Sequence, residues 1–114
     1  MPFISTNVSI HVTNEQEMRL KARFGKAIEK IPGKSEAWLM CDFRDRCRLY
    51  FKGDNGQPCA FVQVKIFGRA RGEAYDQLTA ELTRILAEEL SISADRIYIQ
   101  YQECEYWGWN GRNF

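Results

Sequence analysis

The sequence contains a single histidine, and none of its four cysteines forms a C-x-x-C pair. Cys41, Cys47, Cys59 and Cys104 lie too far apart for the paired spacing of structural zinc or thioredoxin-like sites, so we expect free thiols and neither a metal nor a cofactor. His11 is the only imidazole, and its segment "SIHVT" offers no partner nucleophile. Catalysis of the Ser–His–Asp or Cys–His type is therefore not expected.

An excess of charge of either sign is also missing. Sixteen basic residues face 15 acidic ones, for a net charge of +1, which gives no driving force toward nucleic acid or anionic membranes. No apolar run approaches the roughly 20 residues of a membrane span. The first residues lack the basic and then apolar pattern of a signal peptide. We expect a cytoplasmic protein, with export that needs no leader as an open alternative.

What the sequence does contain is a strand–helix–strand pattern that occurs twice in 114 residues, the size of one domain. Thr13 and Gln16 form a capping box before a helical apolar stripe that Pro32-Gly33 ends. The predicted strands span 2–8, 37–43, 59–67 and 96–102, with a further short strand near 49–51. We expect the strand at 37–43 to be mostly buried, and the strand at 59–67 to carry Val62, Val64 and Ile66 on one face. The second helical stripe runs from Tyr75 to Leu86. This predicts an α+β fold in which two β-α-β units form a four-stranded mixed sheet with both helices on one face.

The two halves align at an offset of about sixty residues, so we interpret the single domain 1–114 as pseudo-repeats of about 2–57 and 58–114. "KSEAWLMCDF" then lies over "SADRIYIQYQ", and Trp38 falls near Tyr98. Crossovers this short favour parallel strands within each unit. Helices cover only one face of such a sheet, while all four strands carry apolar side chains on more than one side. We therefore expect self-association through the open face.

Three features carry chemistry. Removal of Met1 before the small residue Pro2 would leave a secondary amine whose reference pKa is about 7.7–8.0, suited to act as a base, although proline also occurs here by chance in many proteins. Lys34 follows Gly33, where it can serve a site or simply face the helix dipole. The tail "YWGWNGRNF" is rich in aromatic residues, which bury large areas and can wall a pocket when the tail folds back.

Together these residues resemble the macrophage migration inhibitory factor family of the tautomerase superfamily. The resemblance spans the whole chain, and its most specific segments are "MP", "GK", "PCAFV", "ISADRIYI" and "WGWNG…F", in that order. It implies a homotrimer with a pocket at each subunit interface. It also implies keto–enol tautomerase activity on aryl α-keto acids such as phenylpyruvate.

The resemblance further assigns roles to individual residues. Pro2 is the implied base, and Lys34 holds the substrate carboxylate. Tyr98 reaches in from the neighbouring subunit, with Gln100 standing where the family has an asparagine; Tyr98 as a packed interface residue is an equal alternative. The implied pocket wall, which includes several departures from the family pattern, consists of Trp38, Phe67, Trp107, Trp109 and Phe114. We expect Phe67 and Trp107 to narrow the pocket, with Arg69 and Arg71 as additional cations near its mouth.

Two other functions stay open. A secreted, cytokine-like protein that binds a host cell-surface receptor and retains vestigial catalysis would have the same residues. An RNA-recognition module also has the order β-α-β-β-α-β, and "CAFVQV" is similar to half of its aromatic motif. The basic and glycine-containing start of that motif is replaced by the neutral Asn55-Gly56-Gln57-Pro58, which disfavours RNA binding.

Overall fold

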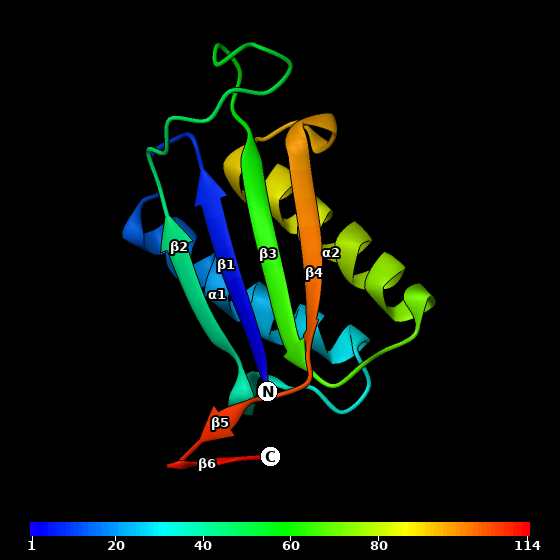
Figure 1. The fold of residues 1–114 in the computed structure, drawn as a ribbon. Helices are drawn as coiled ribbons and strands as arrows, with labels where there is room; N and C mark the ends of the chain where they lie inside the picture. The colour runs from blue at the N-terminus through cyan, green and yellow to red at the C-terminus, as the bar shows by residue number, and fades with distance from the viewer.

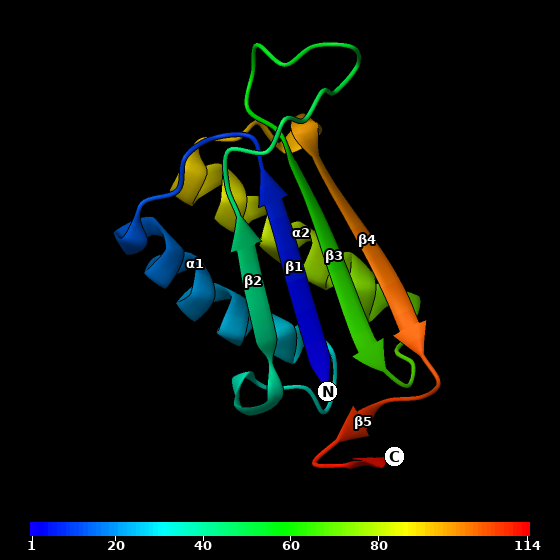
Figure 2. The same ribbon diagram turned by 60° about the vertical axis from the view of Figure 1, so that its left-hand side comes forward.

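The computed structural model describes residues 1–114, which form one four-stranded sheet covered on one face by two helices (Figures 1 and 2). The main elements are β1 (Pro2–Val8), α1 (Asn14–Ala27), β2 (Met40–Arg44), β3 (Ala60–Phe67), α2 (Gly72–Leu90) and β4 (Ile97–Cys104). A small hairpin of β5 (Gly108–Trp109) and β6 (Arg112–Asn113) follows, and three short 3-10 turns span Ile28–Lys30, Glu36–Trp38 and Ala94–Arg96. The predicted fold class is confirmed. Neither helix is long and apolar enough to cross a membrane.

The strand order is β2-β1-β3-β4, with β1 and β3 antiparallel at the centre and a parallel strand on each side. Phe3 lies opposite Met40 and Gln63 lies opposite Gln100, so each parallel pair joins residues 37 positions apart. A duplicated unit would require such a common register in its two copies. The pseudo-repeat itself stays a prediction. Pro2 lies opposite Ile66, which places the start of the chain beside the end of β3.

Helix α1 begins at the predicted capping box. The Gln16 N–H donates to Thr13 Oγ1 at 3.1 Å, and the Thr13 N–H donates to Gln16 Oε1 at 2.9 Å. Its α-helical part ends at Ala27, and the tighter Ile28–Lys30 turn completes it before Pro32. Gly33 has φ +83°, a left-handed conformation that favours glycine and turns the chain toward β2.

The core lies between the sheet and the helices. Val62, Val64 and Ile66 alternate on the helix-covered face of β3, as predicted, and are at most 1% exposed. The side chains that fill this layer with no exposed surface include Ile4, Leu20, Phe24, Ile28, Leu78, Leu82 and Leu86. One apolar layer thus holds both halves of the chain together.

The prediction was wrong about β2 and the segment after it. Ala37 and Trp38 belong to the 3-10 turn, β2 begins only at Met40, and Met40 is 68% exposed rather than buried. The reason is that β2 is an edge strand that pairs only with β1, so apolar composition did not mean burial. The short strand expected at 49–51 does not form; Phe51 makes a single bridge to Asp54.

Replacing Thr13 tests the cap directly. Thr13→Ala removes the hydroxyl that accepts from Gln16 and should lower the free energy of unfolding by about 1 kcal/mol. Thr13→Ser keeps the hydroxyl and is the matched control, with an expected loss below about 0.5 kcal/mol. Urea denaturation followed by circular dichroism measures both. Equal losses in the two variants would contradict the capping role.

Candidate functional site

The candidate site begins at the chain's amino end. Pro2 is buried at the start of β1, and the backbone carbonyl of Met1 accepts from the Phe67 N–H at 3.1 Å. This bond and the pairing with Ile66 hold the amino end against the last residues of β3. The N-terminal amine is therefore a fixed group at one end of the sheet, where the C-terminal hairpin also lies (Figures 1 and 2).

Lys34 reaches the same place from the turn after α1. Its N–H donates to the Ile31 carbonyl at 3.1 Å, which closes the turn around the left-handed Gly33. Its ammonium Nζ donates to the backbone carbonyl of Phe67 at 3.0 Å. The structure thus brings Lys34, the end of β3 and the amine together, as the resemblance implied.

The surroundings change the acidity of the amine. The pKa of the Met1 amino group is lowered from 8.0 to about 6, first because burial disfavours the charged form and then because the Lys34 ammonium repels a second positive charge. A group with this pKa is mostly neutral at pH 7. The site therefore presents a free amine lone pair beside a fixed cation, an arrangement that can accept a proton from a bound carbon or oxygen acid.

Four of the predicted wall residues lie in a row of aromatic rings. Phe67 and Phe114 have centroids 5.5 Å apart, Phe114 stacks on Trp109 at 6.4 Å, and Trp109 meets Trp38 edge to face at 5.1 Å. Trp107 makes none of these ring contacts. Its carbonyl accepts from the Phe114 N–H at 3.0 Å and so closes the tail hairpin. The tail folds back as predicted, and its rings adjoin the end of β3.

Tyr98 and Gln100 lie elsewhere. Tyr98 is opposite Phe61 near the start of β4, whereas Pro2 is opposite Ile66, so they are separated along β3 by roughly 17 Å at the usual strand rise. Tyr98 is 62% exposed and packs edge to face on Phe51 at 5.2 Å. Gln100 accepts from Gln63 Nε2 at 3.3 Å. Within one chain, the structure does not bring these two residues to the amine.

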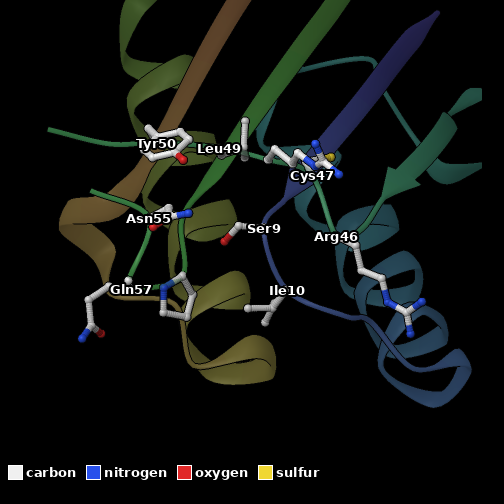
Figure 3. A pocket seen from close by; sticks show the side chains of 11 residues that line it. Ser9, Ile10, Arg46, Cys47, Leu49, Tyr50, Asn55 and Gln57 are labelled. Atoms are coloured by element: carbon white, nitrogen blue, oxygen red, sulfur yellow. The ribbon is translucent and has the colours of Figure 1, made fainter. Parts of the chain in front are cut away.

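The largest cavity is not at this site. A hollow of about 600 Å³ lies at the opposite end of the sheet, beside the long loop between β2 and β3 (Figure 3). Its lining residues are Ser9, Ile10, Arg46, Cys47, Arg48, Leu49, Tyr50, Asn55, Gly56, Gln57 and Pro58. The Arg46 side chain extends away from Tyr50 and Asn55. Nowhere are three or more His, Cys, Asp or Glu side chains grouped as metal ligands would be.

Two groups at the site were missed from the sequence. The first is the Phe67 carbonyl that binds Lys34, because a main-chain atom leaves no signal in residue type. The second is Glu103, whose carboxylate accepts from the Tyr75 hydroxyl and from the Ala70 N–H just beyond the end of β3. No motif singles out Glu103. Its place in the alternation of β4, at the end that pairs with Ile66, was the available clue.

The effect of Lys34 on the amine can be measured. In Lys34→Ala the amine pKa should rise above about 6 but stay below 8.0, because the larger cause, burial, remains. Lys34→Arg keeps the charge and should leave the pKa near 6. The rate of N-terminal carbamylation by cyanate against pH reports this pKa, read on the tryptic peptide that ends at Arg19 and contains no lysine. An unchanged pKa in Lys34→Ala would contradict the repulsion.

The chain was compared with known proteins. Residues 1–114 match the family model described as macrophage migration inhibitory factor. The chain is 35% identical to the macrophage migration inhibitory factor of Mus musculus over 116 aligned positions, covering 100% of this chain and 99% of that protein. It is 36% identical to the Xenopus laevis protein of the same name over 91 residues, 78% of each chain.

Solved structures agree. The crystal structure of Leishmania major MIF2 superposes with a TM-score of 0.92 at 32% identity, covering 100% of this chain and 97% of that one. The homologue from Prochlorococcus marinus gives 0.86 at 28% identity, covering 98% of each chain. Family and fold support a function of the tautomerase or cytokine type. The chain belongs to the macrophage migration inhibitory factor family.

Proposed function

We propose that the protein is a keto–enol tautomerase that acts on aryl α-keto acids such as phenylpyruvate, with Pro2 as the general base after Met1 is removed. The observation that carries the proposal is the lowered pKa of the Met1 amine, one residue before Pro2, which burial and Lys34 cause. Removal of one residue transfers the amine to Pro2, which is itself buried and remains beside the end of β3. Burial and a neighbouring cation act on that nitrogen in the same direction.

The proposed reaction moves one proton between two atoms of the substrate. The Pro2 nitrogen takes the proton from C3, and the electron pair of the C–H bond forms the C2=C3 double bond. The carbonyl oxygen gains the negative charge and then takes that proton from the protonated Pro2 nitrogen, so one C–H bond breaks, one O–H bond forms and the base is regenerated. Ketonisation runs the same steps backward. A base whose pKa lies near the working pH suits both directions. The Lys34 ammonium would hold the substrate carboxylate and stabilise the developing enolate.

The row of aromatic rings supports the choice of an aryl substrate. Phe67, Phe114, Trp109 and Trp38 present apolar surface next to the amine and Lys34, which matches a phenyl group attached to a carboxylate-bearing end. Trp107 is proposed to contribute to the wall through the hairpin that it closes. Tyr98 and Gln100 complete the pocket only if a second copy supplies them.

We propose a homotrimer in which each pocket takes Pro2 from one subunit and Tyr98 from its neighbour. The open face of the sheet supports association. It carries large apolar side chains such as Phe3 and Met40, and Met40 is 68% exposed in the single chain. Contact with a second copy would remove this apolar surface from water, which favours association.

The alternative is a secreted signalling protein that binds a cell-surface receptor. It draws on the names of the curated relatives, which are macrophage migration inhibitory factors. The two proposals differ in what Pro2 does. A receptor ligand should keep its binding when Pro2 is replaced, whereas a tautomerase should lose turnover.

Pro2→Gly tests the catalytic proposal. With Met1 shown to be absent by mass spectrometry, the protein should ketonise phenylpyruvate enol, and Pro2→Gly should lower kcat/KM by about 10²-fold or more, the usual contribution of a positioned base. The change from a secondary to a primary amine and the loss of the fixed ring are responsible. Absence of turnover in the unsubstituted protein would reject the proposal, as would full activity in Pro2→Gly. Circular dichroism controls for folding.

Mixed assemblies test the shared pocket. Pro2→Gly and Tyr98→Ala copies should each be impaired, while assemblies formed by co-expression should recover roughly a quarter of the activity, because random trimers then contain that share of pockets with both residues intact. Light scattering should give about three times the chain mass of 13.3 kDa. If mixing gives only the average of the two variants, Tyr98 does not act in the neighbour's pocket.

A further inference from the structure

One carboxylate oxygen of β4 binds both the loop between β3 and α2 and the start of α2. Glu103 lies opposite Ile66 near the end of β4, and its Oε2 accepts from the Tyr75 hydroxyl at 2.6 Å and from the Ala70 N–H at 3.3 Å. Ala70 belongs to the loop, and Tyr75 lies in the first turns of α2. Glu103 therefore ties the sheet to both the loop and the start of the helix.

This loop leads directly out of the candidate site. Phe67, the last residue of β3, carries the carbonyl that binds Lys34 and the ring that packs on Phe114. Gly68 follows with φ +86°, and its N–H donates to the Cys104 carbonyl at 3.0 Å. A glycine in this conformation is a point where the chain can rotate. The Gly68 N–H and the Phe67 carbonyl belong to one peptide group, so the Cys104 carbonyl holds this group directly. Glu103 holds the chain two residues further on, at Ala70.

The Glu103 anchor is strong for a surface group. Its partners lower the pKa of the Glu103 carboxyl, the Tyr75 hydroxyl first and the Ala70 N–H next. Burial and then Glu103 raise the pKa of Tyr75 to about 12. At neutral pH the bond is therefore that of a phenol to an ionised carboxylate, a charge-assisted hydrogen bond.

Tyr75, the hydrogen-bond partner of Glu103, is itself held in place by Tyr101. The Tyr75 ring packs on Tyr101 at 4.6 Å, and the Tyr101 hydroxyl donates to the Tyr75 carbonyl at 3.1 Å and also bonds to Thr79 Oγ1 at 2.7 Å. Tyr101 is two residues from Glu103 on the same strand and faces the same helix. The anchor is part of a polar network between β4 and α2, so it does not depend on one freely moving side chain.

We propose that Glu103 is a positioning residue of the site, which holds the loop after β3 so that the Phe67 carbonyl keeps the Lys34 ammonium beside the N-terminal amine. Its effect on turnover rests on the proposed tautomerase function. Its effect on the amine does not, because Lys34 lowers the pKa of that group whether or not a substrate is processed.

The proposal makes a prediction opposite in sign to a simple charge effect. Removing a nearby carboxylate should by itself lower the pKa of the amine, because the protonated amine loses a favourable negative charge. Losing the position of Lys34 should instead raise the pKa, because the repulsion weakens. The direction of the change therefore separates positioning from electrostatics.

The variants are Glu103→Ala and Glu103→Gln, with Glu105→Ala as the matched control. Glu105 lines the same hollow of Phe67, Gly68, Arg69, Glu103 and Cys104, but it makes no hydrogen bond to the loop. Glu103→Gln keeps an acceptor oxygen and loses the charge. Tyr75→Phe, which keeps the carboxylate and the ring, is a second variant in case Glu103→Ala fails to fold. N-terminal carbamylation against pH is measured in each.

We expect the amine pKa to rise toward 8.0 in Glu103→Ala, to rise less in Tyr75→Phe, and not to rise in Glu103→Gln or Glu105→Ala. In the Lys34→Ala background, Glu103→Ala should add no further rise, because its effect passes through Lys34. With phenylpyruvate enol, Glu103→Ala should raise KM by about three- to tenfold and leave kcat within about twofold, as expected for weaker binding of the carboxylate.

The proposal is overturned if Glu103→Ala leaves the amine pKa unchanged or lowers it. It is also overturned if Glu103→Ala raises this pKa by the same amount in the Lys34→Ala background as in the unsubstituted protein. Absence of turnover in the unsubstituted protein would reject the tautomerase proposal instead. The carbamylation result would still decide the role of Glu103, so the two failures are distinguishable.

Discussion

The antiparallel pairing of β1 with β3 is the constraint on which the rest of the structure depends. It is the only direct hydrogen-bonded junction between the two halves of the sheet, and each half adds one parallel strand outside it. The register of this pairing places Pro2 opposite Ile66. A slip of one residue would turn the apolar side chains of β3 to the open face, so the buried layer of Val62, Val64 and Ile66 fixes the register. The core thereby determines where the amine lies.

From this constraint the chemistry of the site follows by burial and charge. An amine at the start of a central strand loses part of its hydration, and the turn after α1 brings a cation to the same end of the sheet. Both effects favour the neutral amine. Neither requires a metal ligand or a histidine. A fold with one imidazole can therefore place an amine with a pKa near neutrality at its own backbone terminus.

The sequence was sufficient where one physical signal acted alone. The capping box at Thr13, the alternation in β3 and the apolar stripe of α2 each describe local structure or a single buried face, and each was predicted correctly. Ala37 and Met40 show the limit. Their apolar composition indicated a buried strand, but whether a strand lies at the centre or the edge of a sheet depends on the whole topology.

For the candidate site too, the sequence predicted some residues correctly and left others without a signal. Pro2, Lys34 and the tail rings were found from motif order, and the structure brings them together. Tyr98, by contrast, lies near the other end of the sheet, and Gln100 lies midway along β4. The carbonyl of Phe67 left no sequence signal, because it belongs to the main chain. The carboxylate of Glu103 left only its place in the alternation of β4, because its hydrogen bonds form only after folding.

Because Lys34 binds a main-chain carbonyl, the position of its ammonium does not depend on which side chain stands at position 67. Every amino acid carries a carbonyl, so the residue at position 67 can change its side chain and still hold the lysine. The ring of Phe67, by contrast, packs on Phe114 and shapes the wall. Substitutions at this one position can therefore vary which molecules fit while the electrostatic part of the site is inherited unchanged. Such a division lets the aromatic wall change while the Lys34 ammonium keeps its place beside the amine.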